Sequence, residues 1–213
     1  MSKILYIFDS IFQTNVKIAM QAEKVFKSLN VDYRIRRIER VYGEISELPF
    51  MSNEQINSGY EIVNKADMDW ADGYIIAGPV HSGMISARMK YFLDSCHEEA
   101  ASGAYLHKSF TAIVTGSLLH GGTEKALDQL YSVANQWGCL VISSSLTMSD
   151  GNPYGISFII NKELPYQEAE IALILEKHLS RFCYFSNRLP TQETKEMEIK
   201  IRPYRIADIL LNS

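Results

Sequence analysis

The segment from Ser10 to Asn15 concentrates hydroxyl and amide side chains in six residues, Ser-Ile-Phe-Gln-Thr-Asn. It lies between an apolar run and a segment with helical periodicity. Where a strand ends and a helix begins, unpaired main-chain N–H groups and the helix dipole converge to make an anion site. Several charge-assisted hydrogen bonds of roughly 1.5 to 3 kcal/mol each hold a monophosphate without a lysine. The segment predicts a phosphate site, with a plain N-cap at Thr14 or Asn15 as the alternative.

Two further turns of unusual composition follow apolar runs. Residues 79–84 read Pro-Val-His-Ser-Gly-Met, and residues 116–122 read Gly-Ser-Leu-Leu-His-Gly-Gly. Glycines and small residues allow a backbone to approach a flat ligand closely. The dinucleotide fingerprint Gly-x-Gly-x-x-Gly and the phosphate loop Gly-x-x-x-x-Gly-Lys-Ser/Thr are both missing after the first apolar run. This argues against a standard dinucleotide fold and a P-loop nucleotidase.

Strand-like and helix-like segments alternate along the chain, which is typical of an α/β fold with a parallel sheet. We expect strands at 3–8, 32–38, 73–78, 109–115 and 139–142, and helices at 16–29, 60–65, 85–95, 124–137 and 166–187. A cluster of turn residues at 149–155 precedes the last helix. In a doubly wound sheet, ligands bind outside the carboxyl ends of the strands, at the switch point between the first and third. All three polar loops fall at such ends.

Composition narrows the choice of partners. The chain has 213 residues, enough for one domain, and its net charge of −4 and pI of about 5.8 provide no basic field for nucleic acid or an anionic membrane. The apolar runs are strand-sized and no signal sequence is recognisable, so we expect a cytoplasmic protein.

Three scattered cysteines and five histidines without zinc-ligand spacing predict neither a disulfide framework nor a metal site.

The loops and several dipeptides between them resemble the flavodoxin-like FMN proteins, in particular the Trp-repressor-binding-protein-like NAD(P)H:quinone oxidoreductases and the related NADPH-dependent FMN reductases. The resemblance covers residues 3 to 187. It is carried by Ala71-Asp72, Gly78-Pro79, Gly83-Met84, Met89-Lys90, Phe92-Leu93-Asp94, Ala101-Ser102-Gly103, Gly121-Gly122-Thr123-Glu124, Gly138 and Pro153-Tyr154-Gly155. It implies a five-stranded parallel sheet of order 2-1-3-4-5 with helices on both faces. Residues 1–189 would form this domain, and residues 190–213 a tail that packs on it or on a neighbour.

The resemblance also implies where a cofactor would bind. The FMN phosphate would lie against Ser10, Ile11, Phe12, Gln13, Thr14 and Asn15. The isoalloxazine would be flanked by Pro79, Val80, His81, Ser82, Gly83 and Met84, and its pyrimidine end by Gly116, Ser117, Leu118, Leu119, His120, Gly121 and Gly122. Phe12 occupies a position for an aromatic contact with the nicotinamide, and Gln136 replaces a histidine near the flavin. No catalytic acid or base is assigned, and His120, Tyr154 and Phe12 are the candidates for contact with substrate.

The implied function is an oxidoreductase that passes a hydride from NADH or NADPH through FMN to a quinone or similar small acceptor in a ping-pong cycle, as a homodimer or homotetramer. The chain departs from the family pattern at Gln13, usually glycine, at Leu118 to His120 within the Gly-rich loop, and at Ala100, usually tryptophan. Two alternatives stay open: an electron-carrier flavodoxin, disfavoured by the mild charge and by second and third loops without aromatic residues, and a binding or scaffold protein without turnover.

Overall fold

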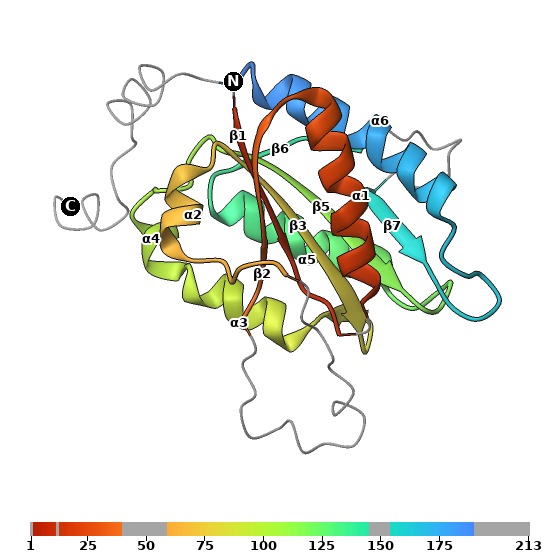
Figure 1. The fold of residues 1–213 in the computed structure, drawn as a ribbon. Coiled ribbons are helices and arrows are strands. Elements are labelled where there is room, and N and C mark those ends of the chain that lie inside the picture. Colours follow the sequence, from red (N-terminus) through yellow and green to blue (C-terminus); the bar gives the residue numbers. More distant parts are fainter. Residues whose placement is uncertain (1, 12, 40–58, 145–153, 190–213) are drawn as a thin grey trace, which may run out of the picture.

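A parallel sheet forms the centre of the protein. The structure is a computed structural model that describes residues 2–11, 13–39, 59–144 and 154–189. The sheet has the strand order β2-β1-β3-β5-β6, which confirms the predicted flavodoxin-like order (Figure 1). Its strands are β1 (Lys3–Phe8), β2 (Asp32–Arg37), β3 (Gly73–His81), β5 (Ser109–Gly116) and β6 (Leu140–Val141).

The edge position beside β5 is shared by two short strands. β6 pairs with the first residues of β5, and β7 (Ile156–Ile159) pairs with the last ones, from Ile113 to Gly116. The strand predicted at 139–142 contains β6, whereas β7 was not predicted. A four-residue run, Ile-Ser-Phe-Ile, is too short for periodicity to separate it from a loop.

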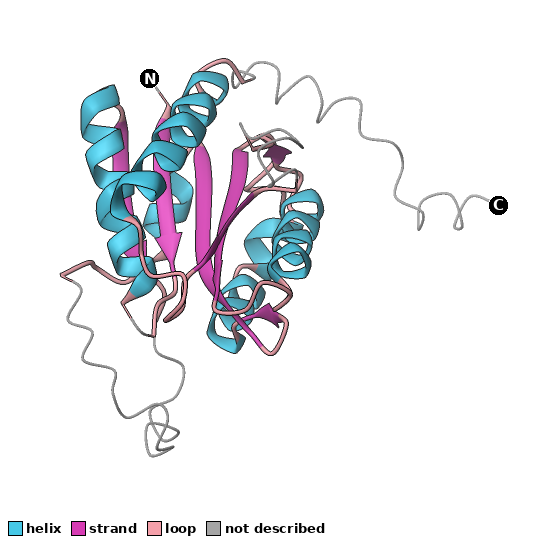
Figure 2. Cartoon of the chain, turned by 90° about the vertical axis from the view of Figure 1, so that its right-hand side faces the viewer, coloured by secondary structure: helices cyan, strands magenta, loops and turns pink. Residues whose placement is uncertain are grey.

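Helices cover both faces of the sheet (Figure 2). α1 (Thr14–Leu29) and α6 (Glu168–Ser186) lie on one face, while α2 (Lys65–Trp70), α3 (Ala87–Ser95) and α5 (Thr123–Gln136) lie on the other. The short α4 (His97–Ala101) follows α3. Residues of β1 alternate between the faces: Tyr6 and Phe8 enter the core beneath α1 and α6, and Leu5 and Ile7 enter the opposite one. Burial on both faces explains why β1 reads as a continuous apolar run.

The helix predicted at 60–65 is wrong, because the helix of this region spans Lys65–Trp70. The segment from Tyr60 to Val63 runs beside the end of β2, with Arg37 N donating to Glu61 O at 3.0 Å. The helix begins only at Lys65, because the Asn64 side chain accepts from Asp67 N and the Asp67 carboxylate accepts from Asn64 N. This capping box sets the first turn of α2.

Some predictions concern residues outside the described part of the chain: Phe12, most of the turn cluster at 149–155, and the tail 190–213. Among the described helices, none is long and apolar enough to cross a membrane. The described residues also contain no group of three or more histidine, cysteine, aspartate or glutamate side chains placed to hold a metal ion.

Candidate functional site

The three polar loops meet in one pocket at the carboxyl ends of β1, β3 and β5. The pocket has a volume of about 280 Å³. The sequence predicted the three loops at the ends of neighbouring strands, and each of them contributes part of the pocket wall. The lining residues are Ser10, Ile11, Thr14, Asn15, Pro79, Val80, His81, Thr115, Gly116, Ser117 and Ile160.

The first loop offers the uncapped start of α1 and the Ser10 hydroxyl as donors, whereas the Asn15 amide is used within the protein. Gln13 adopts a left-handed conformation with φ 62° and ψ −3°, and α1 begins directly after it without a side-chain cap. The first N–H groups of a helix have no partner within that helix. The Asn15 amide, expected to donate to a ligand, instead donates from Nδ2 to the Asp9 carbonyl at 2.9 Å. Ser10 Oγ is buried and has no hydrogen-bond partner among the described residues.

The second loop is a tight β-hairpin. β3 continues past the predicted end to His81, and β4 (Met84–Ile85) pairs antiparallel with Val80 and His81. Ser82 and Gly83 both have positive φ, 52° and 79°, as the two central residues of a type I′ turn require. The hairpin is fixed to α5, because Ile85 N donates to Gln129 Oε1 at 3.0 Å. The hairpin was not predicted from the sequence, although Ser-Gly is a recognised turn signal.

His81 lines the pocket from the hairpin residue next to the turn and is half-buried. Burial lowers the pKa of His81 below its usual value, the Asp9 carboxylate raises it and the Arg88 guanidinium lowers it. The neutral imidazole is therefore favoured at neutral pH, with one nitrogen as donor and the other as acceptor.

The third loop touches the hairpin through glycines. A Cβ on Gly122, which has φ +97°, would lie 2.7 Å from both Cα and the carbonyl oxygen of Gly83. A Cβ on Gly121 would lie 2.9 Å from the carbonyl oxygen of Leu118. Gly122 also precedes the first turn of α5, which has no side-chain cap. Gly122 lets the third loop pack against the backbone of the hairpin, and Gly121 lets the loop fold back on its own residue Leu118.

Behind the pocket wall lies a charged cluster that the sequence reasoning missed. Asp9, directly after β1, accepts from Ser86 Oγ, and its Oδ1 lies 2.7 Å from Nη2 of Arg88. Asp9 and Arg88 are 2% and 5% exposed, so this ion pair is buried. The one available signal was an aspartate at the end of an otherwise apolar strand.

Several predicted residues do not line the pocket. Gln136 is exposed at the last position of α5, at the opposite end of the sheet, and Tyr154 is 70% exposed before β7. His120 is exposed in the third loop. Three apolar side chains expected near the flavin, Met84, Leu118 and Leu119, are exposed on the hairpin and third loop.

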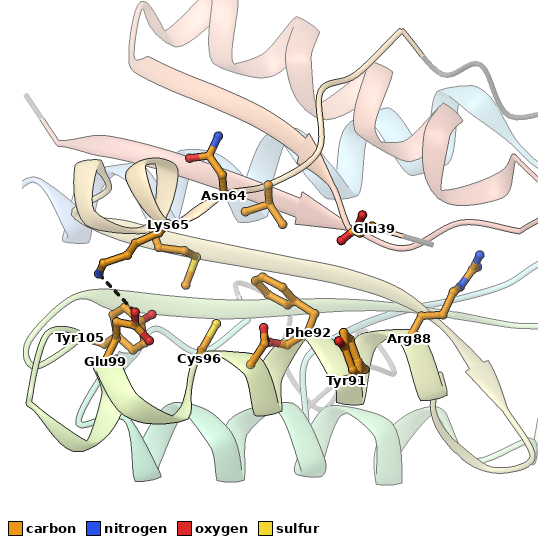
Figure 3. Close-up of a pocket in the computed structure, with 12 residues that line it drawn as sticks. Glu39, Asn64, Lys65, Arg88, Tyr91, Phe92, Cys96, Glu99 and Tyr105 are labelled. Atoms are coloured by element: carbon orange, nitrogen blue, oxygen red, sulfur yellow. Dashed lines mark hydrogen bonds and ion pairs between the residues drawn. The ribbon is translucent and has the colours of Figure 1, made fainter. Parts of the chain in front are cut away.

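A second pocket of about 190 Å³ lies between α2 and α3 (Figure 3). Arg88 lies at one end, while Lys65 and Glu99 form an ion pair at the other, with Lys65 Nζ and Glu99 Oε1 3.4 Å apart. Phe92 and Cys96 lie between these ends. Since this pocket contains none of the polar loops, it is distinct from the candidate cofactor site.

An α/β sheet of this order with a polar pocket at its switch point defines a flavodoxin-like protein. The model of the family "NADPH-dependent FMN reductase" matches residues 3–153. The chain belongs to this family, a family of NAD(P)H-dependent FMN oxidoreductases.

Individual relatives agree with this assignment. A protein named NAD(P)H dehydrogenase (quinone) from Deinococcus radiodurans is 24% identical over 167 residues, covering 75% of this chain and 84% of the relative. A protein of the same name from Brucella anthropi is 26% identical over 172 residues, covering 74% and 82%. Among solved structures, a WrbA-like flavodoxin from Agrobacterium tumefaciens has a TM-score of 0.64 at 17% identity, covering 88% of this chain and 99% of that one. This last likeness supports the fold alone.

Proposed function

We propose that the protein binds FMN in the pocket formed by the three loops and passes a hydride from NADH or NADPH to a quinone or similar small acceptor in a ping-pong cycle. The observation that supports this most directly is the meeting of all three loops, up to about 100 residues apart in sequence, in one pocket at the carboxyl ends of β1, β3 and β5. This is the position at which doubly wound sheets bind their ligands.

The phosphate end of FMN fits the first loop. The uncapped start of α1 offers N–H groups and the positive end of the helix dipole, and Ser10 Oγ is a buried hydroxyl without a partner among the described residues. A phosphate oxygen would accept from this hydroxyl and from the N–H groups at the start of the helix. Asn15 supports the loop from within by its bond to the Asp9 carbonyl.

The ring end fits the hairpin and the third loop. When bound, FMN would supply the hydride-transfer chemistry between the nicotinamide and the acceptor. The chain supplies orientation: Pro79, Val80 and Gly116 line the wall beyond the phosphate end. Main-chain N–H groups of the two loops would stabilise negative charge on the reduced ring. His81 would donate or accept at the ring edge.

An uncharged acceptor suits the surroundings of the pocket. Among the described residues that line it, none carries a carboxylate, an ammonium or a guanidinium group. Next to it, Met84, Leu118 and Leu119 expose apolar side chains, with Leu118 66% and Leu119 67% exposed. Apolar side chains of this kind favour a flat, poorly charged molecule such as a quinone over an acidic one.

The test is a titration of the purified protein with FMN, followed by anaerobic mixing with NADH or NADPH. We expect a change in the visible flavin spectrum on binding, bleaching by one nicotinamide at a catalytic rate, and recovery of the colour with a quinone. Absence of flavin binding would refute the cofactor assignment. Binding without bleaching by either nicotinamide would favour an electron carrier.

Location and assembly are proposals that the resemblance supports: a cytoplasmic protein, forming a homodimer or homotetramer. Light scattering during size-exclusion chromatography distinguishes a dimer from a tetramer, and a monomer would contradict both.

A further inference from the structure

Asp9 connects three elements around the pocket. Its N–H donates to the Ala77 carbonyl of β3 at 2.9 Å, and its own carbonyl accepts from Asn15 in α1 at 2.9 Å. Its carboxylate accepts from Ser86 and pairs with Arg88, at the start of α3. The first loop, from Ser10 to Asn15 and called the phosphate loop below, and the hairpin are thus both attached to a single residue.

Ser86 makes this attachment part of the helix start. Its hydroxyl donates to Asp9, while its oxygen accepts from Met89 N at 3.1 Å as the N-cap of α3. Ser86 immediately follows β4, the second strand of the hairpin. The carboxylate of Asp9 therefore fixes the point where the hairpin ends and α3 begins.

The charges of the pair lie directly behind residues that line the pocket. Asn15 and His81 form part of the wall, the former hydrogen-bonded to Asp9 and the latter influenced electrostatically by both members of the pair. A buried carboxylate without a partner beside an anion site would repel a phosphate and a reduced flavin alike. The Arg88 guanidinium offsets that charge at 2.7 Å.

We propose that Asp9 and Arg88 are positioning residues of the cofactor site: Asp9 holds the phosphate loop and the hairpin together, and Arg88 cancels the carboxylate charge that this attachment places beneath the bound anion. The proposal rests on FMN being the ligand of the pocket. Because the role of Arg88 is to compensate the charge of the Asp9 carboxylate, removing the arginine alone should weaken cofactor binding more than removing both side-chain charges.

The test compares Asp9→Asn, Arg88→Gln and the double variant, with Asp94→Asn as the matched control. Asp94 is an exposed carboxylate on the same helix, paired with Lys90. FMN affinity is measured by flavin fluorescence at one fixed pH for all four proteins. We expect Arg88→Gln to weaken binding about tenfold, the effect of one unit charge at roughly 10 Å in a medium of dielectric near 20. The double variant should recover most of this loss, and Asp94→Asn should bind as the parent does.

A second measurement needs no flavin. The pKa of His81, followed by NMR in the cofactor-free protein, should rise in Arg88→Gln and fall in Asp9→Asn, because one variant removes the positive and the other the negative neighbour. Opposite shifts would support the charge assignment even if FMN proved not to be the ligand, a result that would refute the proposed function only.

Two results would overturn the proposal. In the first, Asp9→Asn and Arg88→Gln weaken FMN equally and the double variant recovers nothing, which is the pattern of a purely structural pair. In the second, neither variant moves the His81 pKa in the expected direction. If Arg88→Gln fails to fold, the His81 pKa in Asp9→Asn still tests the charge assignment, and a pKa that does not fall there overturns it.

Discussion

Replacement of Gly122 by alanine should separate the two loops that form the ring end of the pocket. The added Cβ would lie 2.7 Å from backbone atoms of Gly83, and backbone cannot rotate away as a flexible side chain can. Gly122 also has φ +97°, a conformation that side chains other than glycine rarely adopt. The substitution therefore combines conformational strain with a steric clash.

The two contributions can be separated with a second glycine. Gly59 also has a positive φ, +72°, but a Cβ there meets nothing within 4 Å. Gly59→Ala should carry only the left-handed strain, about 1–2 kcal/mol. Gly122→Ala should add overpacking of about 1–3 kcal/mol, so that the free energy of unfolding falls by about 2–5 kcal/mol in all.

Urea unfolding of the parent and both variants measures these losses, and an FMN titration measures their effect on the pocket. We expect Gly59→Ala to leave FMN affinity unchanged and Gly122→Ala to lower it at least tenfold. The reasoning would be refuted if Gly122→Ala destabilised the protein no more than Gly59→Ala and bound FMN as tightly as the parent.

Three further predictions concern individual side chains. Gln13→Gly should raise the free energy of unfolding by about 1 kcal/mol, because glycine adopts the left-handed conformation of residue 13 without strain; unchanged or lower stability in urea would contradict this. Burial lowers the pKa of His178 to about 4, so the unfolded chain takes up the proton first as the pH falls from about 6.5 to 4, and stability should decrease by about 3 kcal/mol over that window. His178→Gln should flatten this pH dependence in urea titrations, and an equal slope in both proteins would disprove the assignment. Asp67→Asn should cost about 3 kcal/mol, because the buried carboxylate pairs with Arg34 and Arg36 at 2.9 Å each; a loss below 1 kcal/mol in thermal or urea unfolding would exclude a structural role for the pair.

The parallel core of the sheet was predictable because the residue pattern of each strand follows from which of its faces are buried. The buried residues 4–8 of β1 and 73–78 of β3 are apolar, as strands covered on both faces must be, and β2 alternates because Arg34 and Arg36 face Asp67 while Ile35 is buried. The long helices were predicted to within two residues for the same reason. The split edge was not predictable, since β6 and β7 have two and four residues and depend on pairing with β5.

The candidate site was predictable as three loops but not as a set of contacts. Topology alone brings the carboxyl ends of β1, β3 and β5 together, so the loops could be placed from sequence order. The link between Asp9 and Arg88 joins residues 79 positions apart in the chain. No periodicity or motif encodes such a pairing, and neither residue stands in a polar loop. Contacts of this kind follow from packing rather than local pattern.

In the first loop, backbone geometry would provide much of the proposed phosphate site. Gln13 precedes α1 in a left-handed conformation and gives the helix no side-chain cap, and a glycine at this position would relieve the strain. The helix start consequently keeps its N–H groups for another acceptor. A strained, uncapped turn persists only where the surrounding structure holds it, here through the bond from Asn15 to Asp9. The same residue that orders the phosphate loop therefore also carries the charge that Arg88 must cancel.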